Sequence, residues 1–309
     1  MTVSFTHTGK GDSIIGQSYY CTATTSTSLG LGFTKRQANS ETTTTPDQNG
    51  TVTAEGIAVA QAIYDGIHNS AGERAYLSFQ IGSELSHSVT AYDNVTDRYI
   101  LDIPSTGAEY VARWIKLLNI DNPGNNNNVT YDTLVEWMNT GMIRYLDSFQ
   151  TTLPDLTPFQ SHGGKLLHYH GESDPSVPTA SSMHYWNSVR SIMYPNAMDA
   201  ESLDLIQEWY QLYLVPGGVH CGVNDLQPGV WPSANMDTMV AWVEGGVVPT
   251  ALNASATEGY WSGETQELCQ WPTRPLWSGN NSTTLDCVND TASYESWIYE
   301  FPDLKVPVY

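Results

Sequence analysis

Strand-like and helix-like segments alternate between residues 165 and 244. Residues 165–170 and 209–215 read as strands, and turn residues follow each of them. Helical patterns cover about residues 180–194, 200–208 and 234–244. Strands and helices in this order build a layered core, so the expected fold class is α/β.

The part of the chain before this alternation predicts helices instead. Three apolar faces recur with a helical period, at residues 57–67, from the capping box Thr106–Glu109 onward, and at residues 134–145. Prolines at positions 154 and 158 precede the change of pattern. We therefore divide the chain into a mostly helical region, residues 1–158, and an α/β region, residues 159–309.

A polar segment over about residues 22–53 lies within the helical region. It consists mainly of Thr, Ser, Gly and Asn and contains almost nothing that a core would bury, which predicts a mobile loop. Lys35 and Arg36 form an adjacent basic pair inside it. An exposed dibasic step in a flexible segment suits a processing protease, although a chance pair is the alternative.

The charge balance excludes several classes of partner. Twelve Lys and Arg against 33 Asp and Glu give a formal charge of −21. Binding to nucleic acid depends on basic groups that displace counterions, so nucleic acid and anionic membranes are poor partners. No window reaches about 18 consecutive apolar residues, and residues 1–16 lack the apolar core of an export signal.

Glycosylation sequons point to a secreted protein all the same. Asn-x-Ser/Thr tripeptides begin at Asn49, Asn94, Asn128, Asn253, Asn280, Asn281 and Asn289. Of the four cysteines, Cys269 and Cys287 lie close enough in sequence to pair, whereas Cys21 and Cys221 are far apart. Those two are either free thiols or lack their partners. We expect secretion, and an upstream segment that this chain does not contain.

Two residues that follow the predicted strands are candidates for acid–base chemistry. Asp174 follows the first strand and His220 follows the second. Functional side chains gather beyond the carboxyl ends of strands in an α/β sheet, so adjacent strands would bring both to one edge. An Asp that accepts from one imidazole nitrogen leaves the other nitrogen to take a proton from a nucleophile. A turn-forming Asp and a surface His are the alternatives.

The nucleophile that would complete such a triad is missing from its expected place. A G-x-S-x-G elbow exposes the serine on a strained turn, and the sequence contains none. Gly11-Asp12-Ser13 begins the pattern, but Ile14 and Ile15 follow where the next glycine is needed. Ser13 is therefore interpreted as an ordinary loop or cap residue.

A metal site is the rival interpretation of the first strand. His168 and His170 are two residues apart, so a strand would point both imidazoles to one face. No third ligand stands at a spacing typical of metal motifs. We therefore expect no metal site in this chain.

Several segments resemble the tannase and feruloyl esterase family. The likeness extends from about residue 20 to 309 and is strongest in residues 165–175 (KLLHYHGESDP), 215–221 (VPGGVHC), 268–277 (LCQWPTRPLW), 58–66 and 299–309. The resemblance implies a secreted serine esterase of galloyl (tannin) esters, with an α/β-hydrolase core and a large lid inserted before the strand that carries the acid.

The resemblance also implies a role for each matching residue. Asp174 would be the triad acid and His220 the base, and Cys221 would bridge to a Cys beside the Ser. Residues 1–158 would belong to the lid, cut at Lys35–Arg36. A structural calcium site would have its ligands upstream, and no other cofactor is implied. The Cys-Ser segment and the oxyanion-hole residues are absent, so this chain corresponds to the C-terminal portion.

Three functions remain open at this point. The first is a galloyl esterase whose Ser is supplied by the missing N-terminal part of the same enzyme, so that the isolated chain is inactive. The second is a feruloyl esterase of the same family, since the sequence does not separate gallate from hydroxycinnamate esters. The third is a truncated, secreted glycoprotein without catalytic activity. The expected partner of the first two is a small phenolic ester.

Overall fold

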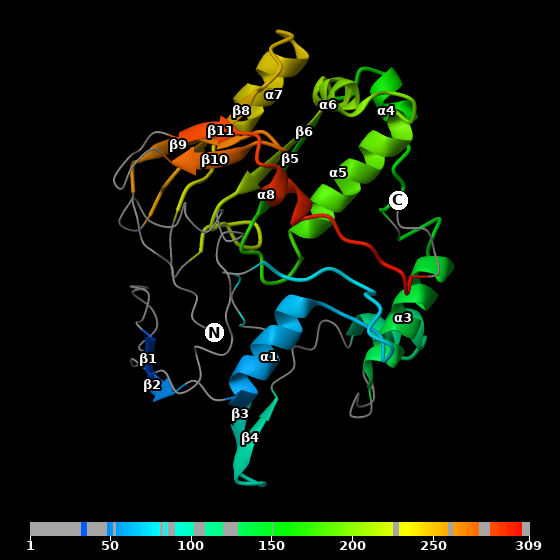
Figure 1. The fold of residues 1–309 in the computed structure, drawn as a ribbon, viewed down its shortest axis with the longest axis vertical. Helices are drawn as coiled ribbons and strands as arrows, with labels where there is room; N and C mark the ends of the chain where they lie inside the picture. The colour runs from blue at the N-terminus through cyan, green and yellow to red at the C-terminus, as the bar shows by residue number, and fades with distance from the viewer. Residues whose placement is uncertain are drawn as a thin grey trace.

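The computed structural model describes most of the chain beyond residue 53 and two short strands before it. The described residues are 32–35, 48–51, 54–80, 83, 85, 90–101, 109–119, 129–149, 151–224, 229–258, 262–277 and 285–304. Their helices and strands (Figure 1) are β1 (Gly32–Lys35), β2 (Gln48–Thr51), α1 (Ala54–Asp65), β3 (Thr90–Asp93), β4 (Arg98–Leu101), the π-helix η4 (Val111–Ile115), α3 (Tyr131–Arg144), α4 (Thr157–Ser161), β5 (Leu166–Gly171), α5 (Ala180–Met193), α6 (Asp199–Gln207), β6 (Tyr210–Val215), β7 (Trp231–Pro232), α7 (Asn235–Val243), β8 (Ala251–Ser255), β9 (Thr265–Cys269), β10 (Arg274–Trp277), β11 (Leu285–Val288) and α8 (Thr291–Glu295).

Strands β5 and β6 form a parallel pair at the centre of the α/β region. Their register runs from Leu166 opposite Tyr210 to Gly171 opposite Val215. Helices α5 and α6 make the crossover between them, as parallel neighbours require. Because the register is parallel, both strands end at the same edge, as the alternation of strands and helices predicted.

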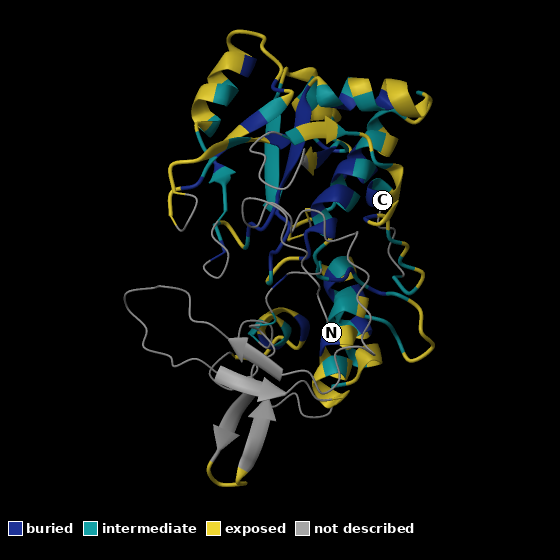
Figure 2. Ribbon diagram, turned by 60° about the vertical axis from the view of Figure 1, so that its left-hand side comes forward, coloured by how far each residue is buried: buried dark blue, intermediate teal, exposed yellow. Residues whose placement is uncertain are grey.

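Strand β6 is buried on both faces and separates two apolar clusters. Tyr210, Leu212 and Leu214 pack with Met183 and Trp186 of α5. Tyr213 and Val215, of the opposite parity, pack with residues of β8 and β9 on the other face. Burial is concentrated in this strand and α5 (Figure 2), which explains why residues 210–215 are almost continuously apolar.

An antiparallel sheet covers the second cluster. Strands β7, β8 and β9 form this sheet, and Tyr213 of β6 makes a bridge to Gln270 at its end. The backbone N–H of Trp271 donates to the carbonyl of Leu212 at 2.8 Å. The segment after β9 therefore extends the central pair. Strands β10 and β11 follow as a hairpin, and the sequence patterns above did not anticipate these antiparallel strands.

A disulfide joins Cys269 at the end of β9 to Cys287 in β11, the pairing that their closeness in sequence predicted. The two cysteines are 18 residues apart. Closing a loop of this length restricts the unfolded chain, so replacing both cysteines by Ala is expected to lower the unfolding free energy by about 3 kcal/mol. Urea unfolding of the double variant, compared with a Cys221→Ala variant, measures the difference. Equal midpoints for the two variants would contradict the expectation.

Two of the three helices predicted in the helical region form α-helices. They are α1 and α3, and the Thr130 side chain caps α3 by accepting from the N–H of Thr133. The predicted second helix is instead a π-helix over Val111–Ile115. Arg144 of α3 binds the C-terminal end of this π-helix by donating to the carbonyls of Trp114 and Ile115, at 2.7 and 2.8 Å. The capping box residue Thr106 lies outside the described residues.

The segment expected to be a mobile loop contains paired strands. Strands β1 and β2 pair antiparallel, with Lys35 opposite Gln48. Lys35 therefore ends a strand, whereas Arg36 lies outside the described residues. Mobility of residues 22–53 and processing at this dibasic pair remain predictions.

The C-terminal segment returns to the helical region. The hydroxyls of Ser78 and Tyr299 lie 3.0 Å apart, and the N–H of Asp303 donates to the carbonyl of Arg74. Tyr299 and Asp303 thus contact residues far outside 159–309, and the proposed division at residue 158 remains a prediction. In the described part of the chain, no helix combines the length and apolar character needed to cross a bilayer.

Candidate active site

The loops after β5 and β6 touch each other through their backbones. The N–H of Ser173 donates to the carbonyl of Gly218 at 2.8 Å, and that of Glu172 donates to Val215 at 2.9 Å. A Cβ atom added to Gly171 would overlap the carbonyl group of Gly218. Both glycines therefore allow an approach that side chains would block, and this contact holds the two loops together.

Asp174 and His220 meet on these loops. Oδ2 of Asp174 lies 3.0 Å from Nδ1 of His220, although 46 residues separate them in sequence. Asp174 is buried, whereas 53% of the His220 side chain is exposed. Since an ionised carboxylate only accepts, Nδ1–H of His220 donates to it and Nε2 is left as the proton-accepting nitrogen. The structure thus brings together the two residues singled out from the strand ends.

The carboxylate of Asp174 is held by four hydrogen bonds. Oδ1 accepts from the backbone N–H of Ser176 and of Val177, at 2.7 and 2.9 Å. Oδ2 accepts from His170 Nε2 at 3.1 Å as well as from His220. Burial alone would raise the pKa of Asp174, but hydrogen bonds from His170, Val177, Ser176 and His220 lower it to about 2. The acid is ionised over the whole physiological range.

This lowered pKa predicts how stability depends on pH. The pKa of the Asp174 carboxyl is about 2 in the folded state against 3.8 ordinarily, so its ionised form stabilises the fold by about 2 kcal/mol above pH 4. That contribution is lost as the pH falls from 4 to 2. The difference in unfolding free energy between the wild type and Asp174→Asn should therefore shrink by about 2 kcal/mol between pH 5 and pH 2. The exposed Asp147→Asn serves as the control, and a pH-independent difference at Asp174 would contradict the assignment.

His168 and His170 lie side by side but do not form an open metal site. Their four ring nitrogens already have protein partners: Tyr210 and Ser182 for His168, and Ser182 and Asp174 for His170. Among the described residues, no cluster of three or more potential metal ligands occurs. These imidazoles are engaged in a hydrogen-bond network that reaches Asp174.

A buried ion pair supports the loop that carries Asp174. Oε1 of Glu172 lies 2.6 Å from Nη2 of Arg274 in β10, and the two side chains are 1% and 2% exposed. Neither carboxylate oxygen of Glu172 accepts a hydrogen bond from another described residue, so the guanidinium of Arg274 compensates its charge. Sequence reasoning missed this ion pair, because 102 positions separate Glu172 from Arg274. The only signal in the sequence was an acidic residue two positions before Asp174.

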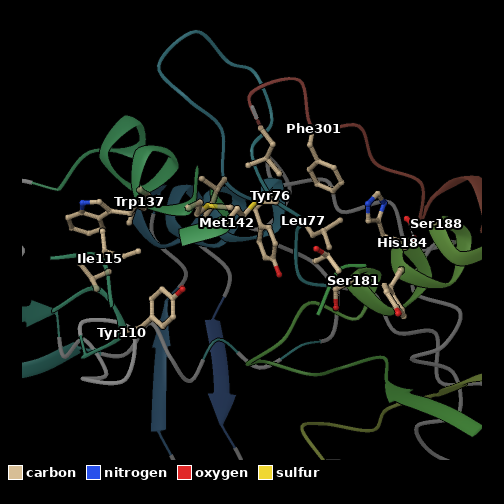
Figure 3. A pocket seen from close by; sticks show the side chains of 17 residues that line it. Tyr76, Leu77, Tyr110, Ile115, Trp137, Met142, Ser181, His184, Ser188 and Phe301 are labelled. Carbon is tan, nitrogen blue, oxygen red and sulfur yellow. Dashed lines mark hydrogen bonds between the residues drawn. The ribbon is translucent and has the colours of Figure 1, made fainter. Parts of the chain in front are cut away.

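A cavity of about 430 Å³ lies between the helical region and α5 (Figure 3). Aliphatic, aromatic and methionine side chains make up most of its walls, among them Tyr76, Trp137, Met142 and Phe301. Ser181 and His184 face it from α5, while the neighbouring Ser182 faces His168 and His170. Neither Asp174 nor His220 lines this cavity, so it is separate from the acid–base pair.

The remaining predicted site residues lie next to this pair, elsewhere on the surface, or outside the described residues. Cys221 is adjacent to His220 and is an exposed free thiol with a left-handed backbone (φ 59°). Asn94, Asn253 and Asn289 are exposed, as glycosylation requires, and Asn49 lies in β2. The other predicted residues, Ser13, Cys21, Asn128, Asn280 and Asn281, lie outside the described residues.

Comparison with known proteins decides the family. The family model described as "Tannase and feruloyl esterase" matches residues 3–294. The chain belongs to the tannase and feruloyl esterase family. It is 64% identical to a tannase of Aspergillus oryzae over 96% of its own length and 52% of that protein. It is also 25% identical to a probable feruloyl esterase of Arthroderma benhamiae, over 80% of this chain and 45% of the relative.

Solved structures agree with this membership. Tannin acyl hydrolase from Aspergillus niger superposes with a TM-score of 0.84 at 41% identity, covering 96% of this chain and 56% of that one. Feruloyl esterase B from Aspergillus oryzae shares the fold with a TM-score of 0.60 at 23% identity, covering 88% and 51%. The expected α/β fold class, with part of an α/β-hydrolase core, is confirmed. The chain spans about half the length of the relatives that it matches.

Proposed function

We propose that this tannase-family chain supplies the acid and base of a secreted serine esterase that cleaves galloyl esters. Asp174 is the acid, His220 is the base, and the nucleophilic serine lies outside these 309 residues. The observation that carries the proposal is the 3.0 Å hydrogen bond between Asp174 Oδ2 and His220 Nδ1 at the shared strand edge. The 64% identity to a protein named tannase supports galloyl esters over hydroxycinnamates, because the matches to feruloyl esterases lie between 25% and 28%.

The reaction follows from the roles of the two side chains. The serine hydroxyl attacks the ester carbonyl while His220 Nε2 takes its proton, and the buried carboxylate of Asp174 stabilises the imidazolium that forms. His220 then gives this proton to the departing alcohol, which leaves a galloyl ester on the serine. A water molecule attacks that ester, again with His220 as base, and gallic acid departs as the serine regains its proton.

Further parts of the proposal concern the surroundings of the pair. Cys221 is exposed and adjacent to the base, which suits a disulfide to a cysteine beside the nucleophile. The exposed sequons at Asn94, Asn253 and Asn289 suit a secreted glycoprotein. Processing at Lys35–Arg36 belongs to the same proposal. The structural calcium implied by the resemblance would take ligands outside this chain.

A chimera tests the function directly. In it, these 309 residues replace the matching part of the Aspergillus oryzae tannase, so that the rest of that protein contributes the remainder of the site. We expect the chimera to hydrolyse methyl gallate faster than methyl ferulate. A chimera with His220→Ala should retain its melting temperature and lose activity, because no other group takes the serine proton.

The isolated chain provides the second arm of this test. Without a nucleophile and oxyanion donors, it should show no turnover of methyl gallate. Turnover at a catalytic rate by the isolated chain would overturn the placement of the serine outside it. A folded chimera that prefers methyl ferulate would make the protein a feruloyl esterase, and a folded chimera inactive on both esters would support a non-catalytic glycoprotein.

A further inference from the structure

A continuous row of hydrogen bonds leads from the buried core to the acid. Tyr210 OH lies 2.9 Å from His168 Nδ1, and His168 Nε2 lies 3.0 Å from Ser182 Oγ. Ser182 Oγ lies 2.7 Å from His170 Nδ1, and His170 Nε2 lies 3.1 Å from Asp174 Oδ2. His168 and His170 lie in β5, Ser182 lies in α5 and Tyr210 lies in β6, so the row connects three elements of the α/β region. We call Tyr210, His168, Ser182 and His170 the His170 relay.

The ionised carboxylate sets the direction of every proton in this row. Because Asp174 only accepts, His170 must carry its proton on Nε2, and a neutral His170 then accepts on Nδ1 from the Ser182 hydroxyl. Ser182 in turn accepts from Nε2–H of His168, whose Nδ1 accepts from the Tyr210 hydroxyl. Each group donates once toward Asp174, and no polar hydrogen in the row is left without an acceptor.

The environment of the distal members agrees with this direction. Burial, and secondarily the nearby His170, lowers the pKa of His168 to about 4, so its imidazole is neutral at neutral pH. Burial raises the pKa of Tyr210, which therefore keeps its hydroxyl proton. Both distal members are thus neutral, as a row in which each group accepts one hydrogen bond and donates one requires.

Two imidazoles therefore share one carboxylate oxygen, and they differ in exposure. His170 is 12% exposed at its side chain and is fixed by the relay, whereas His220 is 53% exposed. The buried imidazole fixes where Oδ2 lies, and this position in turn sets the tautomer and orientation of the exposed base. A shift of about 1 Å in a catalytic group costs about 100-fold in rate.

We propose that His170 is a positioning residue for the Asp174–His220 pair, and that Tyr210, His168 and Ser182 hold it in the tautomer that donates to Asp174. The expected effect on catalysis rests on the proposed function. The hydrogen bonds of the relay do not depend on which ester is cleaved. The relay also gives the His168-x-His170 pair a role other than metal binding.

Substitutions at His170 separate positioning from simple packing. A Gln at this position carries an amide donor for Asp174 and a carbonyl acceptor for Ser182, whereas a Leu carries neither. In the chimera, His170→Leu is expected to lower kcat by about 100-fold with little change in KM, and His170→Gln should recover at least tenfold of that loss. Ser182→Ala leaves His170 without its donor and should lower kcat by about tenfold, while Ser188→Ala on the same helix is the control.

Nuclear magnetic resonance of the whole 309-residue chain tests the relay without any esterase assay. Histidine ¹⁵N shifts should show the neutral Nε2–H tautomer for both His168 and His170 in the wild type. The Asp174 carboxyl should titrate near pH 2, and this midpoint should move upward toward 3.8 in His170→Leu but not in His170→Gln. Ser182→Ala should let the Nδ1–H tautomer of His170 appear.

The outcomes distinguish this inference from the proposed function. An Nδ1–H tautomer of His170 in the wild type, or an Asp174 midpoint unchanged in a folded His170→Leu, would overturn the relay whatever the chimera hydrolyses. Tautomers as expected in a protein whose chimera is inactive would support the relay and contradict the esterase. Equal kcat for His170→Leu and the parent chimera would overturn the positioning role.

Discussion

Replacing Asp174 by Asn in the chimera is expected to lower kcat for methyl gallate by about 10⁴-fold. The amide cannot neutralise an imidazolium, and its NH₂ group favours the His220 tautomer that already carries a proton on Nε2. That nitrogen is then unable to accept the serine proton. The initial rate of gallate release, measured at saturating ester, reports the loss.

A matched variant makes this expectation specific. Asp204 is exposed on α6 and is not among the hydrogen-bond partners of Asp174, so Asp204→Asn removes the same charge without altering the pair. We expect its kcat to equal that of the parent chimera. If Asp174→Asn keeps kcat within tenfold of the parent while remaining folded, Asp174 is not the triad acid.

Replacing Arg274 by Met is expected to destabilise the chain by about 3–5 kcal/mol. The substitution keeps most of the apolar volume but leaves the Glu172 carboxylate, 1% exposed, without the guanidinium 2.6 Å away. Restoring neutrality with Glu172→Gln in the Arg274→Met background should recover part of the loss. Urea unfolding monitored by tryptophan fluorescence measures both changes.

The surface pair Arg113–Glu109 provides the comparison for this buried pair. Its atoms lie 3.0 Å apart, but its side chains are 46% and 42% exposed. Arg113→Met should therefore cost less than about 1 kcal/mol. Similar losses for Arg274→Met and Arg113→Met would contradict the view that burial makes the Glu172–Arg274 contact important for stability.

The parts of the fold that sequence reasoning predicted are those with a local physical cause. The continuous apolar run of β6 and the helical periods of α1, α3, α5 and α7 follow from which faces are buried. The π-helix Val111–Ile115 was not predictable from its own residues, because Arg144 at the end of α3 and Tyr145 after it bind the carbonyls at its end. Strands β8–β11 are short, and tertiary pairing decides them.

The same distinction holds for the candidate site. Asp174 and His220 were found because each follows a strand, and parallel neighbouring strands end at one edge. The His170 relay was missed, and His168-x-His170 was considered instead as a metal pair. The sequence indicates only part of the relay. The alternation of side chains along β5 places both imidazoles on one face, but Ser182 and Tyr210 reach them from other elements. Such contacts are fixed by packing rather than by spacing.

The contact between Gly171 and Gly218 has a consequence for how this chain tolerates change. It joins backbone to backbone, so the separation of the two loops is set without a side chain between them. Residues around the ester can be exchanged for larger or smaller ones without pulling the two loops apart. In the proposed esterase, the positions that select the acid group of the ester would therefore differ from the positions that hold the acid and base together.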